Sequence, residues 1–100
     1  MLFGTTIPST LSSLSPQKAL LLANWYLECA YKSDDSTIAL ELCHETEVSL
    51  NHAKKVAKNT KNKTAIEAIA STYIDLGTVL KIHNYGNESQ VIYKKGLKLG

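Results

Sequence analysis

No proline follows Pro16, so residues 17–100 contain no residue that must interrupt a helix. Alanine, leucine, lysine and glutamate are abundant in this stretch, and all four favour helical backbone. Short polar segments divide it into four parts. We therefore predict an all-α fold, with four helices over about residues 16–32, 35–58, 64–83 and 87–99.

Short connections between these helices make consecutive helices antiparallel neighbours, so the expected units are two helical hairpins. The second and third helices each carry apolar or small residues at alternating steps of three and four, which is typical of one buried helix seam. Those positions are Ala39, Cys43, Thr46, Leu50, Ala53 and Ala57, then Ile66, Ile69, Tyr73, Leu76 and Leu80. The first helix is apolar almost all round, which predicts packing on several sides.

Polar residues mark the ends of the predicted helices. Ser15 followed by Pro16 has the pattern of an N-cap and a first helical residue. Gly86 is the expected left-handed residue after the third helix. Residues 1–15 are rich in Ser and Thr and are predicted to be a flexible arm, whereas residues 16–100 form one helical-repeat-like domain.

The composition narrows the class of protein. Hydrophobic residues make up 44% of the chain and the formal net charge is +2, which argues against a disordered chain. No apolar run is long enough for a membrane span, and the first residues lack a secretory pattern, so we expect a cytoplasmic protein. Cys29 and Cys43 have no metal-ligand spacing; they are interpreted as free thiols, with a disulfide as the alternative.

Charge is unevenly distributed along the chain. Acidic residues dominate residues 28–47, whereas the segment 54–63 contains five lysines and no acid. The lysine-rich segment fits either an acidic partner or anionic lipid, or a solvated helix end. All eleven basic residues are lysine, and the absence of arginine disfavours a nucleic-acid reader.

The sequence contains no complete catalytic or metal-binding motif. His44-Glu45 begins a zinc-protease pattern, but Val48 stands where the second histidine is needed. Glu41 and His44 match one half of a di-iron motif whose other half is missing. A glycine-rich phosphate loop and a nucleophile elbow are also missing. We therefore expect no enzyme activity, no metal and no cofactor.

The second hairpin resembles a tetratricopeptide repeat in the order and spacing of its aromatic and small residues. The matching residues are Tyr73, Leu76, Gly77, Ser89, Tyr93 and Gly96. The resemblance implies a right-handed stack of hairpins and a role in protein–protein interaction. In this interpretation Gly77 and Ser89 allow close contact within the hairpin, and Gly96 admits a following helix.

The stretch from Pro16 to Gly100 is also similar to a helical domain near the N-terminus of large multidomain proteins of early-diverging fungi. Three motifs carry this similarity. They are Ala19-Leu20-x-x-Ala23-Asn24-x-Tyr26-Leu27-Glu28, Ile38-Ala39-Leu40-x-Leu42-Cys43-His44-x-Thr46-Glu47-Val48-Ser49-Leu50 and Tyr93-Lys94-Lys95-x-x-Lys98-Leu99-Gly100. The similarity implies an adaptor or assembly module without catalytic chemistry.

Two surfaces are therefore predicted as functional sites. A groove along the first and third helices would bind a peptide or a partner helix, as in a scaffold or adaptor. Its candidate residues are Leu20, Asn24, Leu27, Ser71, Ile74, Thr78 and Lys81. The alternative is a homo-oligomerisation domain that uses the apolar faces of the first and fourth helices. The candidate self-association residues on the fourth helix are Val91, Ile92 and Leu97.

Overall fold

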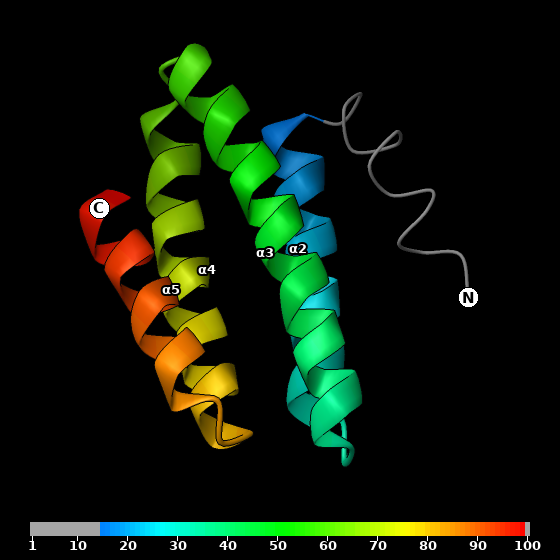
Figure 1. The fold of residues 1–100 in the computed structure, drawn as a ribbon. Helices are drawn as coiled ribbons and strands as arrows, with labels where there is room; N and C mark the ends of the chain where they lie inside the picture. Colours follow the sequence, from blue (N-terminus) through cyan, green and yellow to red (C-terminus); the bar gives the residue numbers. More distant parts are fainter. Residues whose placement is uncertain (1–14, 100) are drawn as a thin grey trace.

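The computed structural model describes residues 15–99, and this part of the chain consists of helices and short connections without a strand. The helices are α2 (Pro16–Lys32), α3 (Ser36–Asn59), α4 (Lys63–Ile82) and α5 (Gly86–Leu99). The all-α prediction is therefore confirmed for this region (Figure 1). The arm predicted at residues 1–15 lies, apart from Ser15, outside the described residues.

Side-chain caps explain where three of the helices begin. The Ser15 hydroxyl accepts a hydrogen bond from the Lys18 amide at the start of α2. The Asp35 carboxylate accepts from the amides of Thr37 and Ile38 at the start of α3. The side chain of Asn62 caps α4 in the same way. Each cap satisfies backbone N–H groups that have no partner within the helix.

Left-handed residues follow α3 and α4, but neither is a glycine. Lys61 has φ 55° and Asn84 has φ 70°, and the Tyr85 amide then donates to the Leu80 carbonyl at 2.8 Å. The prediction for Gly86 is therefore wrong, because Asn84 takes the left-handed conformation and Gly86 is already the first residue of α5. Asparagine tolerates this conformation better than other residues with a Cβ.

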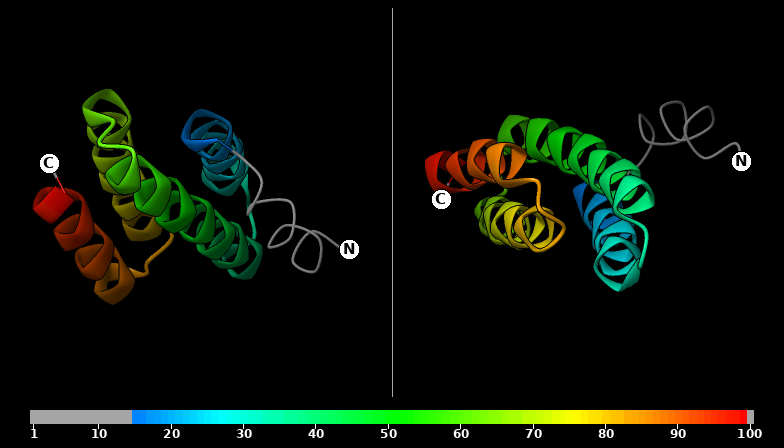
Figure 2. Two further views of the ribbon diagram at one scale, coloured as in Figure 1. Left: turned by 90° about the horizontal axis from the view of Figure 1, so that it is seen from above. Right: turned by 60° about the horizontal axis from the view of Figure 1, so that its bottom comes forward.

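The four helices form two antiparallel hairpins, α2 with α3 and α4 with α5 (Figures 1 and 2). The α4 helix packs against α3 and, less extensively, against α2. In the right panel of Figure 2, α3 and α5 lie on one side of the molecule, and α2 and α4 lie on the other. The helices α2 and α5 therefore stand at opposite ends of the arrangement.

The core lies where the hairpins meet. Every residue of the predicted α3 seam is buried, and so are the α4 seam residues from Ile69 onward, with Ile66 partly buried. The small side chains of the α3 seam let the neighbouring helices approach closely. The expectation for α2 is only partly met: Leu21 is 70% exposed and Trp25 is also exposed, because no helix covers the outer side of α2 within residues 15–99.

The contact between α4 and α5 depends on residues without bulky side chains. The buried Ser89 hydroxyl donates to the Gly77 carbonyl at 2.7 Å. A Cβ at Gly77 would lie 2.7 Å from the Tyr93 ring. A Cβ at Gly96 would lie 3.0 Å from the Ala70 carbonyl oxygen. The space beside Gly96 is therefore occupied by α4, and not by a following helix as predicted.

Two hydrogen bonds join the hairpins at the end where both hairpin turns lie. His83 Nε2 donates to the Ala30 carbonyl at 2.8 Å, linking the end of α4 to the last turn of α2. The Tyr85 hydroxyl donates to the Ser36 carbonyl at 2.8 Å, linking the α4–α5 turn to the start of α3. The α3–α4 connection joins the same two hairpins at the opposite end of the molecule (Figure 1).

Candidate docking face on α3 and α5

The α2 residues predicted to line a groove are not available together. Leu27 is buried in the core, and Leu20 is partly buried against it. Asn24 is exposed, but its side-chain amide donates to the Leu20 carbonyl of its own helix at 3.0 Å. This stripe of α2 therefore packs against the protein more than it faces a ligand.

The α4 residues of the predicted groove are divided between the α5 contact and solvent. The Ile74 side chain lies against the position of Gly96. The Thr78 hydroxyl is hydrogen-bonded to the Tyr93 hydroxyl at 2.9 Å. Ser71 and Lys81 are exposed. The clefts described below contain none of the seven predicted groove residues.

The three predicted self-association residues have different environments. Ile92 is only 3% exposed and belongs to the hydrophobic core, so it does not form part of an outer surface and this assignment is wrong. Val91 is 57% exposed and Leu97 is 73% exposed. Helical geometry explains the difference, because neighbouring residues on a helix point about 100° apart.

A cleft of about 140 Å³ lies between α3 and α5, with α4 residues among its walls. We call it the apolar cleft. It is lined by Cys43, His44, Glu47, Leu76, Leu80, Glu88, Val91 and Ile92. Leu76, Leu80, Ile92 and Cys43 are buried, whereas Val91, His44 and Glu88 are exposed. The cleft therefore offers an apolar floor and a polar rim, an arrangement that suits a buried side chain of a partner.

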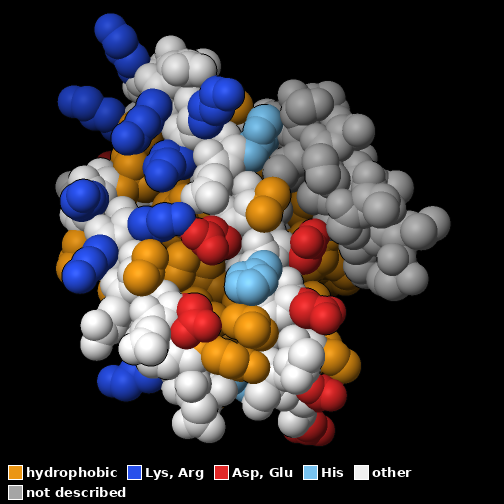
Figure 3. Space-filling view, viewed as in Figure 1, with side chains coloured by type: hydrophobic (Ala, Val, Ile, Leu, Met, Phe, Trp, Pro, Cys, Tyr) orange, Lys and Arg blue, Asp and Glu red, His pale blue; other side chains and the backbone are white. Residues whose placement is uncertain are grey.

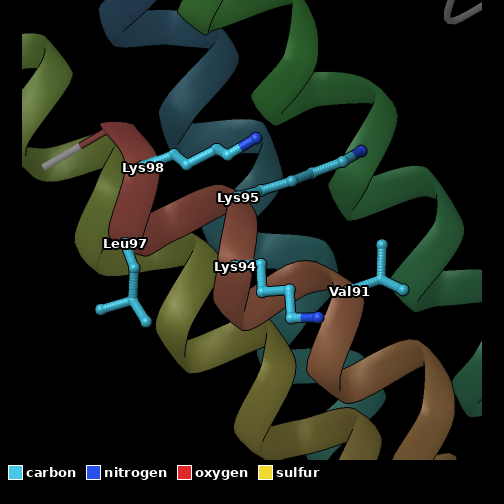
Figure 4. Close-up of a pocket in the computed structure, with 5 residues that line it drawn as sticks. All are labelled: Val91, Lys94, Lys95, Leu97 and Lys98. Atoms are coloured by element: carbon cyan, nitrogen blue, oxygen red, sulfur yellow. The ribbon is translucent and has the colours of Figure 1, made fainter.

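Two further hollows continue this surface toward the C-terminal ends of α3 and α5. One, of about 400 Å³, is lined by α5 residues alone: Val91, Lys94, Lys95, Leu97 and Lys98 (Figure 4). The other, of about 160 Å³, is lined by Lys54, Lys58, Lys95, Lys98 and Leu99. We call the four lysines of the second hollow the lysine cluster. The apolar cleft and the two hollows together are the α3/α5 face.

The α3/α5 face carries lysines toward the C-terminal ends of α3 and α5, and Glu47 and Glu88 around the apolar cleft. Figure 3 shows lysine side chains gathered over α5 and the C-terminal half of α3, and acidic side chains and histidines nearer the centre. Lys95 forms an ion pair with Glu47, which joins α5 to α3 and links the apolar cleft to the lysine cluster. Sequence analysis did not find this pair, because its members are far apart along the chain.

Tyr73 fixes Lys54 at the edge of the lysine cluster. The Lys54 ammonium lies 5.7 Å from the centre of the Tyr73 ring, within the range of a cation–π contact. The Tyr73 hydroxyl in turn donates to the Asn51 side-chain oxygen. Burial lowers the pKa of Lys54, and the charges of Lys95 and Lys58 lower it further, while Glu47 opposes them.

Two buried groups make the protein sensitive to alkaline pH. Burial raises the pKa of the Cys43 thiol from 9.0 to about 11 and also raises the pKa of Tyr73. A raised pKa in the folded state means that the unfolded chain ionises first as the pH increases. We expect the free energy of unfolding to fall by about 3 kcal/mol between pH 8 and pH 11.

Urea unfolding at several pH values, followed by circular dichroism, measures this loss. The Cys43→Ala and Tyr73→Phe variants each remove one ionising group, so their stability is expected to decline less steeply over the same interval. Equal slopes for both variants and the unaltered protein would contradict the assignment. Tyr31, which is exposed, supplies the matched control as Tyr31→Phe.

The described residues bring together no group of three or more His, Cys, Asp or Glu side chains suited to a metal ion. Cys29 and Cys43 are both free, so the alternative of a disulfide between them is not realised. Among α2 to α5, no helix has the length and apolar character of a membrane span.

Comparisons with known protein families, with curated proteins and with solved structures found no match for this chain. Function is therefore inferred from the geometry and charge of the α3/α5 face.

Proposed function

We propose that this chain is a non-catalytic protein–protein interaction module, a scaffold or adaptor, whose α3/α5 face receives a peptide or a partner helix. The apolar cleft carries the proposal. It is walled by α3 and α5, and its apolar floor includes Leu76 and Leu80 of α4. A cleft between parallel ridges of helix, with an apolar floor, is the usual seat of an amphipathic helix or an extended peptide.

The packing of the helices supports a tetratricopeptide-like stack as the framework for this function. The α4 helix packs against both helices of the preceding hairpin, which is the relation between neighbouring hairpins in a helical repeat. Within the second hairpin, the close contact of Gly77 and Ser89 agrees with the resemblance in sequence.

Selection from a phage-displayed random peptide library on the immobilised protein tests the proposed face. Selected peptides are expected to bind the Val91→Glu variant at least about tenfold more weakly, because the new carboxylate lies at the rim of the apolar cleft. Leu21→Glu, which makes a similar change at an exposed apolar residue on α2, is the matched control and is expected to bind normally. No enrichment, or weaker binding by Leu21→Glu alone, would overturn the proposal.

A second candidate function is self-association, favoured by the exposed Leu21 and Trp25 on α2 and the exposed Leu97 on α5. The helices α2 and α5 lie at opposite ends of the molecule, so a contact of α2 with α5 of another copy would be head-to-tail. A contact of α5 with α5 would bring together the lysines that surround Leu97.

Light scattering on the samples used for selection would reveal a dimer or larger species. Dissociation of that species by Leu97→Glu would then support self-association instead.

A further inference from the structure

The lysine cluster holds more positive charge than residues 15–99 neutralise. The hollow between Lys54, Lys58, Lys95 and Lys98 contains no carboxylate among its described lining residues. Glu47, which is next to it, is already paired with Lys95. Bringing like charges together costs free energy, and a bound anionic group would recover that cost.

Two of the four lysines in the cluster are also held in place before any partner arrives. Lys54 is partly buried over the Tyr73 ring, and Lys95 is tied to Glu47 on the neighbouring helix. Burial lowers the pKa of Lys54, and the positive charges of Lys95 and Lys58 lower it further. Fixed ammonium groups lose less conformational freedom on binding than freely moving surface lysines.

Apolar side chains accompany the lysines and distinguish the kind of anion. Leu99 lines the same hollow as the lysine cluster, and Val91 lines both the adjacent hollow and the apolar cleft, whereas Leu97 does not belong to the lysine side of α5. Figure 4 shows the Leu97 side chain on the opposite side of α5 from the Lys95 and Lys98 side chains. A phosphate backbone offers no apolar side chains for such a surface, and the chain contains no arginine for base or phosphate contacts.

We propose that the partner of the α3/α5 face is a protein segment in which Asp or Glu residues stand next to an apolar residue. Its carboxylates bind the lysine cluster, and its apolar side chain enters the apolar cleft beside Val91. This inference rests on the proposed function of the α3/α5 face and specifies the chemistry of its partner. The attraction between the carboxylates of the segment and the lysine cluster sets the direction in which the segment lies along the face.

The peptides enriched in the random-library selection test the inference directly. We expect an excess of Asp and Glu together with Leu, Ile or Phe in the enriched sequences. For the most enriched peptide, fluorescence anisotropy is expected to show about tenfold weaker binding to the Lys54→Gln/Lys98→Gln double variant, and binding that weakens as salt rises. A counterpart peptide with every Glu replaced by Gln is expected to lose a similar factor.

Lys18→Gln/Lys63→Gln is the matched control, because it removes the same charge from exposed lysines outside the cluster. Circular dichroism checks that each variant remains folded. Enriched peptides that have no excess of Asp and Glu, but whose binding still requires Val91, would overturn the inference that the partner is acidic. They would leave the proposed function standing. The absence of any enriched peptide would overturn both. If the selection enriches no peptide but the protein binds phosphatidylserine vesicles, the result would point to a membrane surface and contradict the inference.

Discussion

Ile92→Glu is expected to lower the free energy of unfolding by about 4 kcal/mol, a large fraction of the total stability of a domain of this size. Ile92 belongs to the hydrophobic core and is 3% exposed. Glutamate at this position would place a carboxylate among apolar side chains and remove the packing of the isoleucine. Urea unfolding followed by circular dichroism at neutral pH measures the loss.

Leu97→Glu is the matched control, because it makes a similar substitution on the same helix at a residue that is 73% exposed. We expect its stability to change by less than about 1 kcal/mol. A stable Ile92→Glu variant would contradict the placement of α5 on the core. The comparison also shows why Leu97, and not Ile92, is a suitable position for testing self-association.

Gly96→Val is expected to lower the free energy of unfolding by about 3 kcal/mol. Even a Cβ at this position would lie 2.9 Å from Ile74 Cδ1 and 3.0 Å from the Ala70 carbonyl oxygen. A side-chain atom of isoleucine can move, but the carbonyl belongs to the backbone of α4. The branched side chain of valine would therefore separate α5 from α4 along their whole contact.

Gly86→Ala is the control for this substitution, because a Cβ at Gly86 meets nothing within 4 Å and its φ is not positive. We expect that variant to be as stable as the unaltered protein or more stable by up to about 1 kcal/mol, since alanine reduces the freedom of the unfolded chain. Thermal unfolding gives both values. Equal stability of Gly96→Val and the unaltered protein would show that the hairpin tolerates separation.

The helices were predictable from the sequence because their signals are local. Proline at the start of α2, caps such as Asp35, and the regular spacing of the α3 seam act within a few residues of one another. The end of α4 was less predictable. Asn84 and Gly86 both tolerate the left-handed conformation, and hydrogen bonds of the finished turn select Asn84.

The α3/α5 face was not predictable in the same way, because its residues come from three helices. Leu76 and Val91 come together when α4 packs against α5, and Cys43 joins them only when the two hairpins pack. Helical spacing places Leu20, Asn24 and Leu27 on one stripe, but spacing alone does not say which side of α2 the second hairpin covers. The lysine-rich segment was visible in the sequence, whereas its union with Lys95 and Lys98 of α5 depends on tertiary packing.

The hydrogen bonds of His83 and Tyr85 have a consequence for binding at the α3/α5 face. The chain links the hairpins at one end, between α3 and α4, and these two bonds link them at the other. The walls of the apolar cleft belong to different hairpins, so a molecule tied at both ends resists the twisting that would widen or close it. The proposed docking surface is thus preorganised, and a partner bound there would spend little of its interaction energy on ordering the module.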